Sequence, residues 1–162
     1  MVRDFLYMVI ALFLITSCAR SRLTHSELEK AKKEVILRHD VDSYNELIWH
    51  YSDSSEYMEQ FPFDLIMCKA NNSSACYECY KNYIRVCNSG KLDKLSIGKL
   101  DKPERDFLFN ILNKGALLGD EYCRSYLYYY FKNGIVVKKD SLKADSLSKF
   151  FPKGYFDKIR HL

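Results

Sequence analysis

The stretch Lys114–Asp140, KGALLGDEYCRSYLYYYFKNGIVVKKD, decides the fold of this chain. Gly119 and Asp120 interrupt an apolar helical pattern that begins near Pro103, and Asn133-Gly134 is a typical helix end. The stretch therefore predicts the end of one helix, a second helix over about 121–132, and a loop. Asp140 can cap a further helix over about 141–151, because Asp is a favoured N-cap residue.

The sequence upstream of this stretch also predicts helices. Thr24-His25-Ser26-Glu27 forms a capping box for a helix over 25–38, and Asp42 or Ser43 can cap the next helix, through Tyr51. Ser54-Ser55-Glu56 opens a third helix, in which Pro62 either begins a helical segment or kinks one. A fourth helix is predicted over about 75–88, followed by a connecting loop over 91–102. No long alternating segment argues for a sheet, so we expect an all-α chain.

The N-terminus predicts export. Phe5–Ile15 is an uninterrupted run of eleven apolar residues, which as a helix rises about 16 Å, too short for a hydrocarbon core of about 30 Å. The following Ile15-Thr16-Ser17-Cys18 resembles the lipobox of bacterial lipoproteins, which implies cleavage before Cys18 and lipid on its thiol. We therefore expect a signal peptide over 1–17, a lipidated tether over 18–24 and a single helical domain over 25–162. An ordinary secretory signal and an uncleaved anchor are the alternatives.

The segment from Lys114 to Ala144 resembles a Sel1-like repeat, a relative of the tetratricopeptide repeats. The residues that fit the pattern of that family are Ala116, Gly119, Asp120, Leu127, Gly134, Val137, Asp140 and Ala144. Tyr128 and Val136 depart from it, because each replaces a glycine of the repeat. The resemblance implies antiparallel helix pairs, with the N-terminal helices as caps that close the exposed apolar face.

The charge of the chain limits its partners. It has 25 Lys and Arg against 21 Asp and Glu, a formal net charge of +4, and Lys30, Lys32 and Lys33 are interleaved with Glu29 and Glu34. Nucleic-acid binding usually needs a clustered basic face, so we expect no nucleic-acid partner. The expected location is the cell envelope, facing the periplasm, with exposure at the cell surface as the alternative.

The motif Cys76-Tyr77-Glu78-Cys79 is the main candidate for chemistry. A CxxC pair at a helix start can be redox-active or can form half of a zinc site, but no second CxxC accompanies it. Cys76 and Cys79 share a helical stripe with Tyr80, Tyr83 and Cys87, which favours core packing over a disulfide or a redox pair. None of the four histidines has the i, i+4 spacing of a helical metal site. We therefore expect no metal, no cofactor and no catalytic residues.

Tyrosines crowd the helix predicted over 121–132. Tyr122, Tyr126 and Tyr129 fall on one face, whereas Tyr128 and Tyr130 point elsewhere. Tyrosine combines a large contact area with a polar tip, which suits protein interfaces, although packing against neighbouring repeats is the simpler alternative. The sequence thus favours a membrane-anchored binding module for a protein partner, in an adaptor or immunity-type role. A thiol-redox protein using Cys76 and Cys79, or a purely structural envelope protein, are the alternatives.

Overall fold

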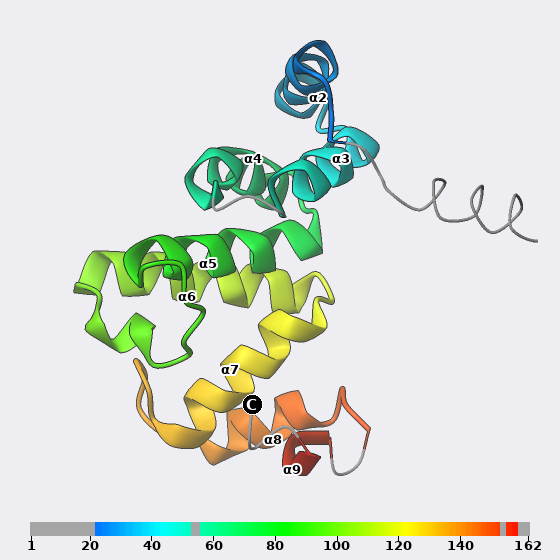
Figure 1. The fold of residues 1–162 in the computed structure, drawn as a ribbon. Helices are drawn as coiled ribbons and strands as arrows, with labels where there is room; N and C mark the ends of the chain where they lie inside the picture. The colour runs from blue at the N-terminus through cyan, green and yellow to red at the C-terminus, as the bar shows by residue number, and fades with distance from the viewer. Residues whose placement is uncertain (1–21, 53–55, 153–154, 159–162) are drawn as a thin grey trace, which may run out of the picture.

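The computed structural model describes residues 22–52, 56–152 and 155–158, and within these ranges the chain is helical and has no strand (Figure 1). The α-helices are α2 (His25–Arg38), α3 (Val41–Ser52), α4 (Tyr57–Lys69), α5 (Ser73–Cys87), α6 (Lys102–Leu117), α7 (Glu121–Asn133), α8 (Ser141–Ser148) and α9 (Tyr155–Lys158). The prediction of an all-α fold is therefore confirmed. None of the described helices combines the length and the apolar character that crossing a membrane requires. The predicted signal peptide and Cys18 lie outside the described residues.

Several helices begin and end at the residues that the sequence indicates. Thr24 and Glu27 form the predicted capping box, in which the Thr24 backbone N–H donates to Glu27 Oε2 at 2.8 Å. Asp120 caps α7 by accepting a hydrogen bond from the Cys123 backbone N–H at 2.7 Å. Asp140 caps α8 in the same way, accepting from Lys143. Each cap satisfies a backbone N–H that has no partner inside its helix.

Other details differ from the sequence-based expectation. The second helix begins at Val41, and it is Asp40, rather than Asp42 or Ser43, whose carboxylate accepts from a first-turn backbone N–H. Pro62 lies inside α4. The loop predicted over 91–102 contains a short 3-10 helix, η1 (Ser96–Lys99), which is anchored by the fully buried side chain of Ile97.

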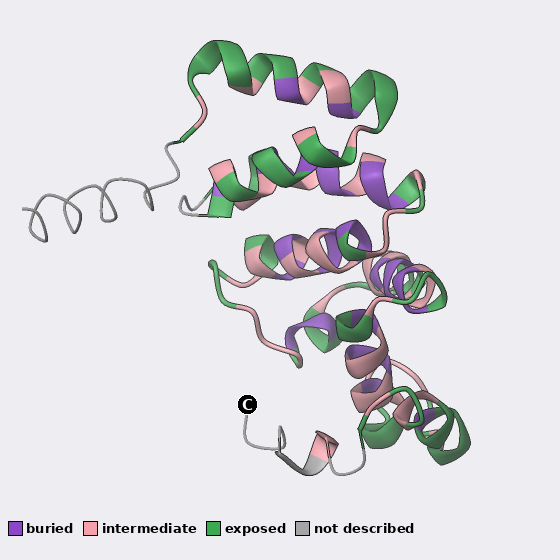
Figure 2. Cartoon of the chain, turned by 90° about the vertical axis from the view of Figure 1, so that its right-hand side faces the viewer, coloured by how far each residue is buried: buried purple, intermediate pink, exposed green. Residues whose placement is uncertain are grey.

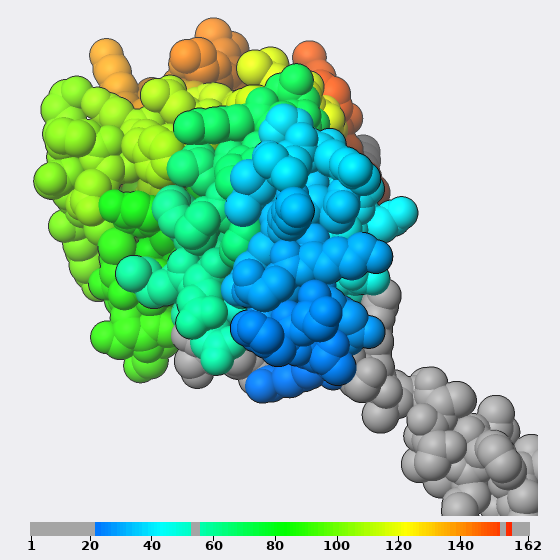
Figure 3. All heavy atoms as spheres, turned by 90° about the horizontal axis from the view of Figure 1, so that it is seen from above, coloured from blue at the N-terminus to red at the C-terminus, as the bar shows by residue number. Residues whose placement is uncertain are grey.

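The helices stack along the molecule in chain order (Figure 1). Each α-helix from α2 to α7 packs against the next α-helix along the chain, and α5 also contacts α7 and η1. Buried residues gather on the facing sides of the helices, while the outer side of α2 is largely exposed (Figure 2). Seen along the stack, α2 and α3 cover its N-terminal end (Figure 3).

Gly115 allows α5, α6 and α7 to approach closely. It is a buried residue of α6, and a Cβ built on it would lie 2.9 Å from Cys76 Cβ on α5 and would overlap Cys123 Sγ on α7. Only glycine fits at such a distance without displacing a neighbouring helix. The close approach brings α5 and α7 near each other, so that side chains of these two helices can contact one another.

The loop after α7 contains an unusual backbone conformation. Gly134 ends α7 in the left-handed region with φ of 71°, as expected for a C-terminal cap. Val136 also has a positive φ, 67°, which a β-branched residue rarely adopts. Val136 thus stands at a position where the backbone conformation favours glycine.

Candidate functional site

The three tyrosines singled out on α7 differ in exposure. Tyr122 is 60% exposed, Tyr126 is 6% exposed and Tyr129 is half-buried. Tyr126 is therefore mainly a core residue, and Tyr122 is the one whose ring is most available to solvent. Of the three, Tyr122 is the best placed to contact a partner.

Tyr77 of α5 joins this group. Its ring stacks on that of Tyr122, with centroids 4.7 Å apart and planes 18° apart, and it lies 5.9 Å from the ring of Tyr126. Tyr126 in turn meets Tyr80 edge-on at 5.0 Å. Burial is the main cause that raises the pKa of Tyr77 and of Tyr126, so both hydroxyls remain protonated.

Two lysines lie over the tyrosine rings. Lys94 Nζ, from the loop that follows α5, is 5.7 Å from the ring centroid of Tyr126 and 5.3 Å from that of Tyr129. Lys81 Nζ, one turn along α5, is 5.7 Å from the centroid of Tyr77 and pairs with Glu78 at 2.5 Å. These distances are within the range of cation–π contacts. We call this group the tyrosine–lysine surface: Tyr77, Lys81, Lys94, Tyr122, Tyr126 and Tyr129.

Buried tyrosines fix the loop that carries Lys94. Tyr130 is fully buried, and its hydroxyl donates to the Lys94 backbone carbonyl at 3.1 Å. Since that proton is used, the adjacent hydroxyl of Tyr80 donates to Tyr130. The loop is therefore held to the core directly beneath Lys94.

Tyr128, as expected, points away from this surface and stacks on Phe156 of α9.

The cysteines are arranged differently from a CxxC pair. Cys76 forms a disulfide with Cys68, which joins the end of α4 to the first turn of α5. Cys79 is a free, fully buried thiol, and burial raises its pKa to about 12. A redox-active thiol needs access and a lowered pKa, so the structure does not bring Cys76 and Cys79 together as such a pair. Cys123 is free and buried. Cys87 is free and exposed, so the expectation that it packs in the core with the other residues of its stripe is wrong.

A buried carboxyl group lies between α3, α4 and α5. Asp64 is fully buried, and its oxygens accept hydrogen bonds from the Tyr44 hydroxyl at 2.8 Å, Gln60 Nε2 at 3.0 Å and Asn82 Nδ2 at 2.8 Å. Burial raises the pKa of Asp64 to about 7, against the opposing effect of these three donors. The network satisfies the buried polar groups and links α3 to the rest of the stack.

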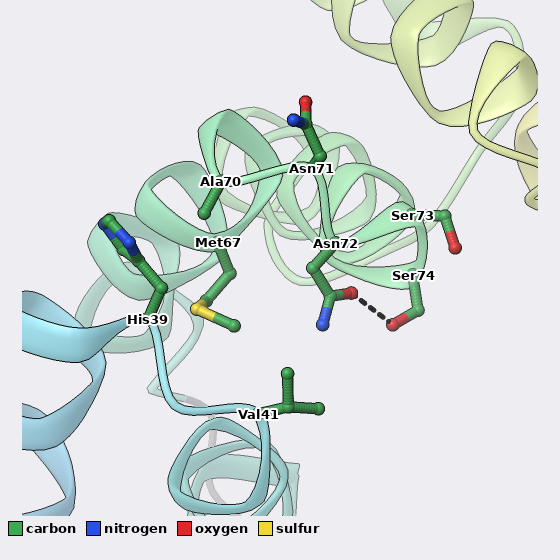
Figure 4. A pocket seen from close by; sticks show the side chains of 8 residues that line it. All are labelled: His39, Val41, Met67, Ala70, Asn71, Asn72, Ser73 and Ser74. Atoms are coloured by element: carbon green, nitrogen blue, oxygen red, sulfur yellow. Dashed lines mark hydrogen bonds between the residues drawn. The ribbon is translucent and has the colours of Figure 1, made fainter.

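Two open hollows lie at the edges of the stack. The first, of about 460 Å³, lies between the α2–α3 turn and the α4–α5 turn and is lined by His39, Val41, Met67, Ala70, Asn71, Asn72, Ser73 and Ser74 (Figure 4). Asn72 Oδ1 is already engaged there, because it accepts from the Ala75 backbone N–H at 3.1 Å and from the Ser74 hydroxyl at 2.9 Å. The second, of about 530 Å³, is lined by Tyr57, Met58, Arg85, Val86, Ser89, Gly90 and Lys91.

The described part of the chain has no group of three or more His, Cys, Asp or Glu side chains that could hold a metal ion.

Sequence reasoning missed Tyr77, Lys81 and Lys94 as members of the tyrosine–lysine surface. The i, i+4 spacing of Tyr77 and Lys81 on α5 is a signal that could have grouped those two. Lys94 gives no such signal, because only the path of the loop brings it to α7.

The chain was compared with protein-family models, with curated proteins and with solved structures, and no match was found in any of the three comparisons.

Proposed function

We propose that this chain is a membrane-anchored helical-repeat protein of the cell envelope, and that it binds a protein partner through the tyrosine–lysine surface. The observation that carries the proposal is the exposed ring of Tyr122, which stacks on the partly buried ring of Tyr77. Tyrosines whose rings are held by packing lose little conformational entropy on binding, which is why they serve as anchors in interfaces.

The Sel1-like interpretation of the segment from Lys114 to Ala144 belongs to the same proposal. Two features support it: Gly119 and Gly134 both have positive φ at the helix ends where the repeat pattern has glycine, and Val136 adopts a glycine-like conformation at the other glycine position of the loop. In this interpretation, α6 and α7 would form an antiparallel helix pair. The N-terminal helices α2 and α3 would form the cap. A lipid on Cys18 would provide the anchor.

The anchor is tested by fractionation of cells that produce the full chain. Replacing Cys18 by alanine should move the protein out of the washed membrane fraction, whereas replacing the exposed Cys87 by alanine should leave it there. Retention of the Cys18→Ala protein in membranes would contradict a lipid anchor at that residue.

Partner binding is tested by site-specific photo-crosslinking in intact cells. A photoreactive phenylalanine at position 122 should give a discrete crosslinked product, and the same residue at position 37 should not. Leu37 is a suitable control because it is 66% exposed on α2, which packs on α3 and α4. Equal crosslinking at both positions, or none at position 122, would favour a purely structural role.

A further inference from the structure

Charge is distributed very unevenly along the chain. Residues 1–80 contain 8 basic and 12 acidic residues, whereas residues 81–162 contain 17 basic and 9 acidic residues, which together make up the 25 basic and 21 acidic residues of the whole chain. The division falls within α5, and every member of the tyrosine–lysine surface except Tyr77 belongs to the basic half. The excess of basic over acidic residues in this half favours ligands of negative charge.

Lys94 is the cation of this surface that has no paired anion. In the described part of the chain, Lys81 pairs with Glu78, but no carboxylate lies within 4.0 Å of Lys94 Nζ. The Lys94 ammonium group instead faces the rings of Tyr126 and Tyr129. A contact with ring faces leaves the donor capacity of an ammonium group unused, because it has three N–H donors.

The backbone of Lys94 is held by the core. The hydrogen bond from the buried Tyr130 hydroxyl to the Lys94 carbonyl holds the backbone of the loop at this point. A cation held in place before binding loses less entropy on meeting its ligand than one on a free loop does. The site therefore combines an unpaired, positioned cation with the exposed aromatic ring of Tyr122.

We propose that the tyrosine–lysine surface recognises an acidic segment of the protein partner, in which a carboxylate pairs with Lys94 and an adjacent apolar side chain packs on Tyr122. This inference rests on the proposed function, because it names the chemistry of the partner at the same surface. A charge-assisted hydrogen bond supplies the specificity, and the ring of Tyr122 supplies contact area.

The test measures binding of two fluorescent ten-residue peptides to the full-length lipidated protein in detergent micelles. Both peptides carry one central phenylalanine; one has glutamates on either side of it and the other has glutamines. We expect the glutamate peptide to bind at least tenfold more tightly, with an affinity that falls as salt is added. Equal affinity of the two peptides would overturn the proposal.

Variants assign the effect to the surface. Lys94→Gln should weaken binding of the glutamate peptide about tenfold and leave the glutamine peptide unchanged, while Lys132→Gln, an exposed lysine at the end of α7, should change neither. Tyr122→Ala should weaken both peptides. If Lys94→Gln and Lys132→Gln have the same effect, charge recognition by Lys94 is wrong.

The outcomes separate this inference from the function on which it rests. Crosslinking at position 122 together with no preference for the glutamate peptide would retain the binding module and overturn its acidic ligand. A crosslink from position 122 to residues of a second copy of this chain, or to nucleic acid, would also overturn an acidic protein partner. Absence of any crosslink from position 122 would overturn both the binding function and the acidic ligand.

Discussion

The ring of Tyr77 on α5 stacks on the ring of Tyr122 on α7, across the junction at which Gly115 lets the three helices meet. The pair joins two helices that are not consecutive in the chain, and one of its rings remains open to solvent. On α7, we therefore expect the exposed Tyr122 to serve mainly binding and the buried Tyr126 to serve mainly stability.

Replacing Tyr122 by alanine should lower the free energy of unfolding by only about 0.5–1.5 kcal/mol, the value of an aromatic pair. Replacing Tyr126, which is buried, should cost about 3–5 kcal/mol, as for other large buried aromatic residues. Urea denaturation followed by circular dichroism measures both. Equal losses would show that Tyr122 is a core residue and would remove it as a binding anchor.

Replacing Gly115 by alanine should destabilise the protein by about 1–3 kcal/mol, because the added methyl group overlaps Cys123 Sγ and crowds Cys76 Cβ. Gly98→Ala is the matched control, since a Cβ there meets no atom within 4 Å. Thermal or urea denaturation of the two variants gives the comparison. The Gly115→Ala/Cys123→Ala double variant should recover part of the loss, and a fully additive double variant would argue against the overlap.

Replacing Val136 by glycine should be tolerated better than replacing its neighbour Val137. Both changes remove a half-buried valine side chain, but only position 136 has a positive φ, and relief of that strain is worth about 1–3 kcal/mol. We therefore expect Val136→Gly to be more stable than Val137→Gly by about 1–2 kcal/mol in urea denaturation. A smaller loss at position 137 would contradict the loop conformation.

Asp64 should make the stability of the protein fall as pH rises from about 4 to about 7. Its pKa in the folded protein is about 7, above the ordinary value of 3.8, so the folded state binds more protons than the unfolded state in this window. The stabilisation is complete below the unfolded pKa and is lost as pH rises through the folded pKa, with a slope of up to about 1.4 kcal/mol per pH unit. Urea denaturation at a series of pH values measures this slope.

The Asp64→Asn protein should lose this slope, because the side chain no longer titrates. Asp145→Asn, which changes an exposed carboxyl group of α8, should keep it. If the wild-type and Asp64→Asn proteins show the same pH dependence, Asp64 is not the group responsible.

The cysteines should react with N-ethylmaleimide in three classes, which peptide mapping by mass spectrometry distinguishes. Cys87 should be labelled in the folded protein at pH 8, because it is exposed. Cys79 and Cys123 should be labelled only after unfolding, since both are buried and burial raises their pKa. Cys68 and Cys76 should require reduction as well. Labelling of Cys79 in the folded protein would restore the redox alternative.

Much of the helical fold follows from local sequence. Helix ends are marked by Thr24, Asp120, Gly134 and Asp140, because capping depends on residues within a few positions of one another. Apolar spacing identifies the buried faces only in part, since Leu117 and Leu142 belong to such patterns and are largely exposed. The sequence also predicted that Tyr122, Tyr126 and Tyr129 share one face of α7, because residues three and four apart lie on the same face of a helix.

Only the tertiary structure decided how these helices combine into a surface. The stacking of Tyr77 on Tyr122, the placement of Lys94 over two rings, the Cys68–Cys76 disulfide and the burial of Asp64 all join residues from different elements. Such contacts depend on helix packing and on the path of loops, in which a single glycine such as Gly115 sets the distance between helices. Caps and periodicity act over one or two helical turns, so the sequence could determine the elements, whereas the candidate site arises from their arrangement in space.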